Sequence, residues 1–187
     1  MLTIVFLATI LMEILSAGGV LYSVFAPDRR IWPPQKPRSW QSILMNVLFL
    51  GSAAGVVALG LLDWSGASLA PVIRFALGGF LWLAGLALSI WSIASLGPAA
   101  SVGDESALFQ NGPYRYTRNP QYLGFIVALW GWSLVSASFL TLIAAIVGAF
   151  TLWLVPWAEE PWLSTKYCGE YSVYRRGVPR WLVWRRQ

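Results

Sequence analysis

The chain has 187 residues, of which 57% are hydrophobic and 11% are charged, and its mean hydropathy is +0.61. A soluble domain has about half apolar and about a quarter charged residues, so this composition indicates an integral membrane protein. The formal charge of +5 sits mostly in loops and at the C-terminus, which favours anionic lipid headgroups over nucleic acid as its partner. The absence of histidine excludes histidine-based metal sites and histidine general bases, and no metal is expected.

Four apolar stretches give the expected membrane segments. Residues 2–25, 43–62 and 72–96 are each long enough for one crossing, which takes about 20 apolar residues. Residues 122–157 are about twice as long and contain a small polar patch at 136–138, so we interpret them as a hairpin of two helices. In the tail, aromatic residues at helical spacing predict a short amphipathic helix. The predicted fold is an all-α membrane bundle of about five transmembrane helices, the last two a hairpin, plus a C-terminal amphipathic helix.

The positions of basic residues predict the orientation of the bundle. The first and third loops and the tail are basic, whereas the second loop, residues 63–71, contains no Lys or Arg. Because cytoplasmic loops carry an excess of Lys and Arg, we expect the N-terminus outside and the C-terminus in the cytoplasm. The tail residues that contribute are Lys166, Arg175, Arg176, Arg180, Arg185 and Arg186.

A polar segment, Gly-Pro-Tyr-Arg-Tyr-Thr-Arg-Asn-Pro-Gln-Tyr-Leu-Gly, occupies residues 112–124, at the start of the fourth span. Asn119 followed by Pro120 is typical of an N-cap and first helical residue. The start of a helix attracts anions, and Arg118 adds a planar donor group. Tyrosines 114, 116 and 122 offer flat surfaces for a ring. The alternative is an ordinary interfacial loop that anchors in lipid headgroups.

Two adjacent carboxylates, Glu159 and Glu160, follow the fifth span, and Pro156 should kink the helix before them. Adjacent helical residues point about 100° apart, so we expect one Glu to face the bundle and the other to face Arg or water. Such a carboxylate suits an ammonium group. The alternative is a solvated helix end.

Two charged residues lie within the apolar stretches themselves. Glu13 is near the middle of the first span, where an ionised acid is costly, so it is protonated, paired or functional. Arg74 is near the start of the third span and can extend to the outer interface. Small residues four apart, Gly51 with Gly55 and Gly124 with Ala128, predict close helix packing.

Taken in order, the polar segment, an apolar hairpin, Glu-Glu, Tyr-Cys-Gly-Glu-Tyr-Ser-Val-Tyr and Val-Pro-Arg resemble the isoprenylcysteine carboxyl methyltransferase and phospholipid methyltransferase superfamily. The resemblance covers roughly residues 108–181. It implies a single membrane domain, residues 1–187, in which three N-terminal spans (1–96) precede a cofactor-binding methyltransferase core (108–187). It also implies S-adenosylmethionine (SAM) as the cofactor and an active site at the cytoplasmic face.

The resemblance also assigns roles to residues. It places Tyr114, Arg118, Asn119, Tyr122, Gly124, Glu159 and Glu160 in the cofactor site. Of these, it makes Arg118, Asn119 and Glu160 the expected catalytic residues. Acceptor binding is expected from the tail residues Tyr171, Tyr174, Arg175 and Arg180. Carboxyl methyltransferases typically have Arg-His-Pro where this chain has Arg118-Asn119-Pro120, which weakens a prenylcysteine assignment more than a methyltransferase one.

Three functions remain open at this point. The leading one is a SAM-dependent methyltransferase for a lipophilic or amphipathic acceptor, such as a prenylcysteine, a phospholipid amine, a hydroxyl or a small thiol. The second is an NADPH-dependent membrane reductase of the sterol or steroid type. The third is a non-catalytic membrane scaffold or carrier.

Overall fold

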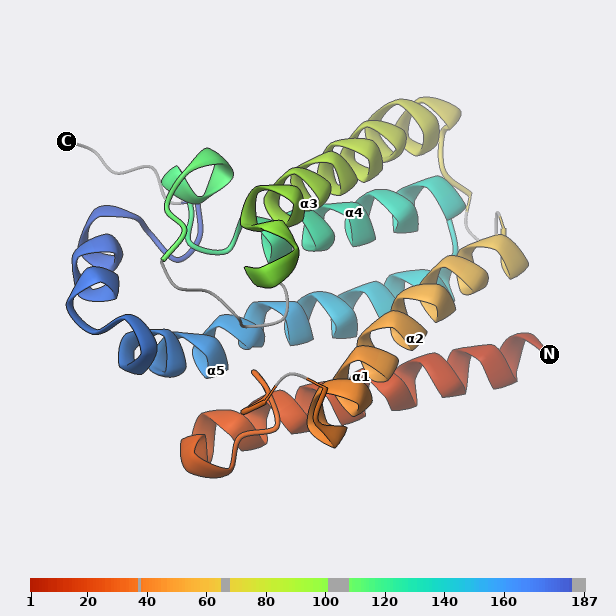
Figure 1. Cartoon of the computed structure of the whole chain (residues 1–187). Helices are drawn as coiled ribbons and strands as arrows, with labels where there is room; N and C mark the ends of the chain where they lie inside the picture. The colour runs from red at the N-terminus through yellow and green to blue at the C-terminus, as the bar shows by residue number, and fades with distance from the viewer. Residues whose placement is uncertain (37, 65–67, 101–107, 183–187) are drawn as a thin grey trace.

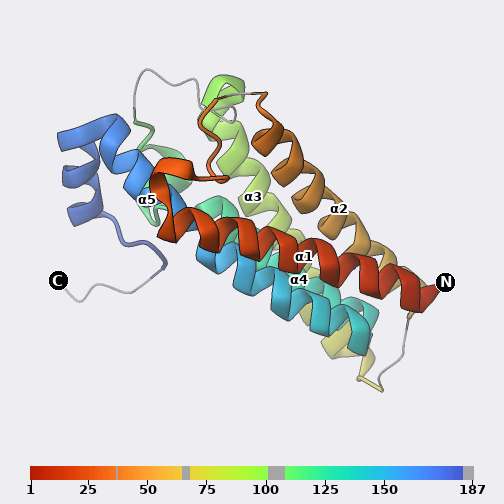
Figure 2. The ribbon, with the colours of Figure 1, turned by 90° about the horizontal axis from the view of Figure 1, so that it is seen from below.

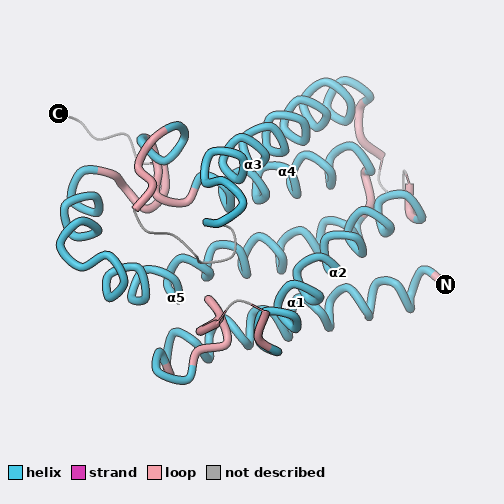
Figure 3. Tube along the Cα trace, viewed as in Figure 1, coloured by secondary structure: helices cyan, strands magenta, loops and turns pink. Residues whose placement is uncertain are grey.

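The protein is an all-helical bundle, seen in a computed structural model that describes residues 1–36, 38–64, 68–100 and 108–182 (Figure 1). Its helices are α1 (Leu2–Phe25), α2 (Trp40–Leu62), α3 (Gly79–Ala100), α4 (Pro120–Ser136) and α5 (Phe139–Gly177). Short 3-10 helices cover Pro27–Arg29 and Gly112–Arg115, and the π-helical segment Val72–Gly78 leads into α3. The described residues contain no strand (Figure 3). The predicted all-α class is confirmed.

Four helical segments are long and apolar enough to cross a membrane: Leu2–Phe25, Trp40–Leu62, Val72–Leu96 and Phe139–Gly177. Their outward faces carry exposed apolar side chains, as at Ile4, Leu7 and Leu11 of α1, which suit contact with lipid. α4 has 17 residues, a length of about 25 Å at 1.5 Å per residue. The chain is therefore an integral membrane protein, and the count of about five spans stays a prediction.

Successive helices run in alternating directions, so the two chain termini lie at opposite ends of the bundle (Figures 1 and 2). One end carries the segment from Gly112 to Tyr122, the first loop and the C-terminal tail, and we call it the motif end. This grouping of the basic loops agrees with the expected arrangement, whereas the side of the membrane that the motif end faces stays a prediction. Arg185 and Arg186 lie outside the described residues.

The predicted hairpin is present, and its turn lies where the polar patch is. Ala137 ends α4 in the left-handed region (φ 51°), and the Ser138 hydroxyl caps α5 by accepting a hydrogen bond from Thr141 N at 3.0 Å. Ser138 also donates to Asp63 at 2.7 Å. Arg74 lies at the end of the bundle away from the motif end. It donates to the Val135 carbonyl at 2.9 Å and so caps the end of α4.

The helix that follows is longer than expected. The sequence predicted that the fifth span closes around Glu160, whereas α5 continues through Pro156 and Pro161 to Gly177. Its break is at Cys168, where φ is 44° and ψ is −119°. A proline removes one hydrogen bond and bends a helix without necessarily ending it, which accounts for the difference. The break falls within the stretch expected to form the amphipathic tail helix, and that separate helix stays a prediction.

Glycines allow α3 and α4 to pack closely at the motif end. A Cβ atom on Gly124 would lie 2.6 Å from the Gly85 carbonyl oxygen and 2.8 Å from Ser89 N. The predicted small-residue motif on α2 likewise faces a neighbour, since a Cβ on Gly51 or Gly55 would clash with Met12 or Thr9 of α1. Close backbone approach is the usual way in which helices associate in lipid.

We therefore expect Gly124→Ala to destabilise the protein by about 1–3 kcal/mol, the range for overpacking, because two of the three atoms that a Cβ would meet belong to the backbone of α3. Gly79→Ala is the matched control, since a Cβ there meets nothing within 4 Å. Thermal unfolding in detergent, followed by tryptophan fluorescence, measures both variants. Equal melting temperatures for the two would contradict close packing at Gly124.

Candidate active site

One buried carboxylate, Glu160 on α5, binds two arginines from distant parts of the sequence. Its Oε1 lies 3.0 Å from Arg118 Nη1 and accepts from Arg180 Nε at 2.8 Å, while Oε2 accepts from Arg180 Nη2 at 2.6 Å. The side chains of Glu160 and Arg118 are only 7% and 9% exposed. We call Arg118, Glu160 and Arg180 the arginine–glutamate cluster. Hydrogen bonding to Glu160 raises the pKa of the Arg180 guanidinium above its ordinary value.

The tail is held against the polar motif by backbone contacts as well. Arg118 N donates to the Pro179 carbonyl at 3.0 Å, and the Thr117 hydroxyl donates to the Arg180 carbonyl at 2.8 Å. Asn119 Nδ2 also donates to the Arg180 carbonyl, at 3.1 Å. Asn119 is the N-cap residue of α4 as predicted, but its side chain makes no capping hydrogen bond. It holds the tail instead.

The second carboxylate, Glu159, faces the bundle. Its Oε1 accepts hydrogen bonds from Trp32 Nε1 at 2.8 Å and from the Tyr122 hydroxyl. The expectation that the two glutamates point in different directions is thus met, because Glu160 faces the arginines. Glu159 has neutral donors as its hydrogen-bond partners, and no cation among the described residues forms an ion pair with it.

Tyrosines surround the arginine–glutamate cluster. The Tyr171 hydroxyl accepts from Arg118 Nη1 at 3.3 Å, and Tyr174 donates to the Tyr114 carbonyl at 2.7 Å. Tyr114, Tyr171 and Tyr174 are buried, whereas Tyr116 is 63% exposed. Tyr122, which contacts Glu159, is a fourth tyrosine at this end of the bundle. Four of the predicted tyrosines therefore lie together at the motif end: Tyr114, Tyr122, Tyr171 and Tyr174.

Other predicted residues lie elsewhere. Arg175 is exposed on α5 and belongs to no described contact of the cluster. Gly124 is at the α3–α4 interface, where it serves helix packing.

Two residues that sequence reasoning did not propose take part in the site. Trp32 from the first loop binds Glu159, and the Trp157 ring lies 3.7 Å from the Arg180 guanidinium carbon. A Trp next to two prolines, as in Trp32-Pro33-Pro34, was a signal that could have directed attention to the first loop.

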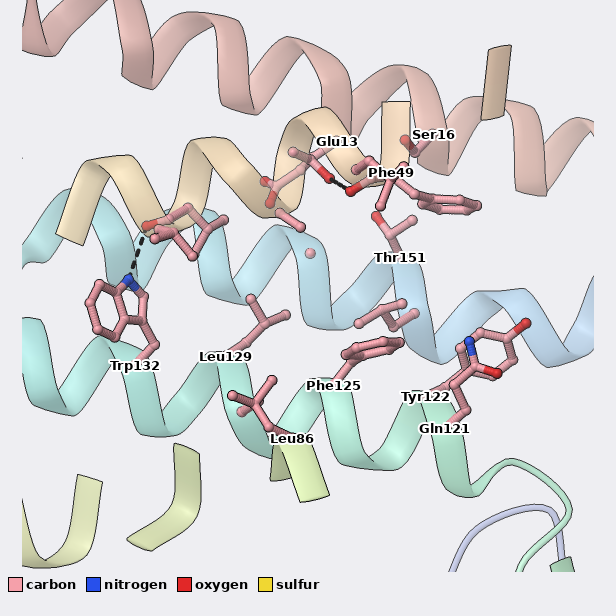
Figure 4. Close-up of a pocket in the computed structure, with 18 of the residues that line it drawn as sticks. Glu13, Ser16, Phe49, Leu86, Gln121, Tyr122, Phe125, Leu129, Trp132 and Thr151 are labelled. Carbon is pink, nitrogen blue, oxygen red and sulfur yellow. Dashed lines mark hydrogen bonds between the residues drawn. The ribbon is translucent and has the colours of Figure 1, made fainter. Parts of the chain in front are cut away.

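A cavity of about 440 Å³ extends from this region into the bundle (Figure 4). Tyr122 and Gln121 lie at one end of it and Trp132 at the other. Its lining is mainly apolar and comes from all five helices. α2 and α3 both contribute side chains, yet within the described ranges these two helices do not pack extensively on each other. Both helices therefore line the cavity without extensive contact between them.

The charges of the site are separated in a simple way. Two guanidinium groups against one carboxylate give the arginine–glutamate cluster a surplus of one positive charge. The adjacent Glu159 supplies a negative charge when it is ionised. Arg118 Nε is buried without a hydrogen-bond partner, so it has a donor to offer a ligand. The site therefore suits a ligand with a carboxylate and an ammonium group close together.

Comparison with known proteins identifies the family of the chain. The family of phospholipid methyltransferases matches residues 73–170, just over half of the chain. The chain belongs to this family of membrane proteins. The match begins in the third span, earlier than the resemblance seen in the sequence motifs, and it includes the polar motif and both glutamates.

A curated relative is steroid 5-alpha-reductase DET2 from Solanum lycopersicum, which is 26% identical over 106 residues. The aligned part covers 57% of this chain and 41% of the relative, so the chain spans about two fifths of the length of that protein. No solved structure matches the chain.

The contacts predict that the two glutamates contribute unequally to the stability of the protein. Glu160→Gln leaves two arginines without their shared carboxylate, so we expect a loss of about 1.5–3 kcal/mol, the range for hydrogen bonds to charged groups. Glu159→Gln should stay within about 1 kcal/mol of the wild type, because the amide oxygen still accepts from Trp32 and Tyr122. Thermal unfolding measures both, with Glu170→Gln as an exposed control. A larger loss for Glu159→Gln than for Glu160→Gln would contradict these assignments.

Proposed function

We propose that this protein is a SAM-dependent methyltransferase that acts on a lipophilic or amphipathic acceptor at the motif end of the bundle. The observation that carries the proposal is the separation of charge within a family of methyltransferases: a cluster with surplus positive charge lies beside an unbalanced carboxylate. The amino-acid part of SAM carries a carboxylate and an ammonium group on one carbon, which matches that separation.

The residues fit SAM in the following arrangement. Glu159 binds the ammonium group, because its own partners are neutral. Arg118, through its free Nε and with the first amides of α4, binds the carboxylate. Tyrosine rings at the motif end cover the adenine. Glu160, already bound by two arginines, acts as a positioning residue that orients Arg118.

Bound SAM supplies a methyl group on a sulfonium, which is already activated for transfer. The protein then has to align donor and acceptor and to exclude water. The tail serves the second purpose, since Thr117, Arg118 and Asn119 hold residues 179 and 180 over the motif. An amine acceptor must first lose a proton, and Glu160 is poorly suited to take it while two guanidinium groups neutralise it.

The acceptor reaches the site through the cavity. A lipophilic molecule enters between α2 and α3 and brings its reactive group to the end at Gln121 and Tyr122. Tyr122 contacts Glu159, so this end of the cavity adjoins the proposed cofactor site. Lipid and cofactor thus approach from different directions, which keeps the apolar acceptor in an apolar path.

A second candidate is an NADPH-dependent membrane reductase, favoured by the similarity to a steroid 5-alpha-reductase. Arg118 and Arg180 are its natural contacts for phosphate groups. Glu159 argues against this candidate. NADPH is an anion, so a carboxylate with no cation beside it would repel the cofactor rather than bind it.

Direct binding of SAM and NADPH to protein in lipid nanodiscs, measured by isothermal titration calorimetry, separates the two. We expect SAM to bind and Glu159→Gln to weaken it roughly tenfold to a hundredfold, from the loss of about 1.5–3 kcal/mol. Arg118→Lys should bind more weakly than wild type and Arg118→Ala more weakly still, since lysine lacks the planar donor pair.

Arg30→Ala is the control. Arg30 lies at the motif end, but it donates to the Pro33 carbonyl and makes no described contact with the cluster. The SAM affinity of Arg30→Ala should therefore stay within about twofold of the wild-type affinity. Binding of NADPH without SAM would assign the reductase function, and equal effects of Arg30→Ala and Arg118→Ala would refute the cofactor site.

A further inference from the structure

Glu13 is an ionisable side chain in the wall of the apolar cavity, with no ion-pair partner among the described residues. It lies on α1, is 3% exposed, and its Oε2 makes no hydrogen bond to any described residue. Figure 4 shows it on the cavity wall between Trp132 and Tyr122. An acid at this depth of a membrane protein is costly unless a binding partner satisfies it.

No described residue donates a hydrogen bond to Glu13 Oε2, and several donors on the cavity wall are used elsewhere. The hydroxyl groups of Ser16, Ser52 and Thr151 each donate to a carbonyl of their own helix. Trp132 Nε1 donates to the Val56 carbonyl. None of the residues that line the cavity is basic. A molecule in the cavity can therefore supply a donor to the Glu13 carboxyl group.

Space for the Glu13 carboxyl group is made by a glycine on the facing helix. A Cβ atom on Gly148 of α5 would lie 2.9 Å from Glu13 Oε1. The carboxyl group therefore rests against the α5 backbone at the level of Gly148. Glu159 is eleven positions further along α5, about 16 Å at 1.5 Å per residue.

We propose that Glu13 is a binding residue for a long lipophilic ligand that carries a hydrogen-bond donor, an amine or a hydroxyl group, within its apolar part. This inference rests on the proposed function, in which the same ligand is the methyl acceptor. Its reacting group then lies near Tyr122 and its donor about 16 Å away along α5. A molecule with a plain hydrocarbon body leaves Glu13 unsatisfied. Glu13 thus selects among lipids by a polar group far from the reaction.

Probe binding tests this proposal. Dodecylamine, dodecanol and dodecane are added in turn, without SAM, to the protein in phosphatidylcholine nanodiscs, and thermal unfolding is measured. A ligand that binds the folded state raises the melting temperature in proportion to its affinity. We expect dodecylamine and dodecanol to stabilise wild-type protein more than dodecane, with affinities about tenfold or more higher.

Glu13→Leu should abolish this preference for donors, and Glu170→Gln, a change of an exposed glutamate, should keep it. If Glu13→Leu does not fold, Glu13→Gln replaces it, because it keeps the volume and loses the charge, so dodecylamine should lose its advantage there. The infrared carbonyl band that Glu13→Gln removes should shift with dodecanol. It should disappear with dodecylamine, which binds as an ammonium ion while the acid releases its proton to water.

Equal stabilisation by all three probes, or a donor preference that survives in Glu13→Leu, would overturn the assignment. Neither result bears on SAM binding. A protein that fails to bind SAM but keeps its Glu13-dependent preference would refute the proposed methyltransferase and leave the ligand site in place.

Discussion

The motif end of this protein depends on one buried carboxylate. Glu160 joins α5 to the segment before α4 through Arg118 and to the C-terminal tail through Arg180. A buried carboxylate is stable only when it is paired with a cation. Glu160 is paired with two arginines, so the three side chains together carry one net positive charge. The position of the tail, the orientation of Arg118 and the charge available to a ligand all follow from this arrangement. The neighbouring Glu159 points toward Trp32 and Tyr122 instead, and when ionised it gives the site a negative charge as well.

The bundle complements this site with an apolar space. α3 and α4 pack closely through glycines, and α1 packs on α2 and α5, whereas α2 and α3 stay apart in the described part of the chain. The cavity is lined by side chains from all five helices. A polar site at one end of an apolar cavity suits a reaction between a water-soluble cofactor and a molecule dissolved in lipid. Membership of the phospholipid methyltransferase family agrees with such a division.

Sequence patterns predicted much of this architecture because membrane segments are long and apolar. Residues 2–25 and 72–96 were predicted with the bounds that the structure gives, and the turn at Ala137 followed from a small polar patch. The end of α5 was missed because proline bends a helix more often than it ends one. Local patterns could not predict which glutamate meets the arginines, because Arg118 and Glu160 are 42 positions apart in the chain. The contact between Trp32 and Glu159 spans 127 positions and was missed for the same reason.

The central claim is methyl transfer from SAM to a lipophilic acceptor, and mass spectrometry of the products tests it most directly. Membranes that contain the protein are incubated with SAM carrying an isotope-labelled methyl group, and the lipid extract is analysed. The account predicts a labelled methyl group in a lipophilic product with wild-type protein and a large loss of that product with Glu159→Gln. Equal labelling with and without the protein, or a product that forms only with NADPH, would contradict it.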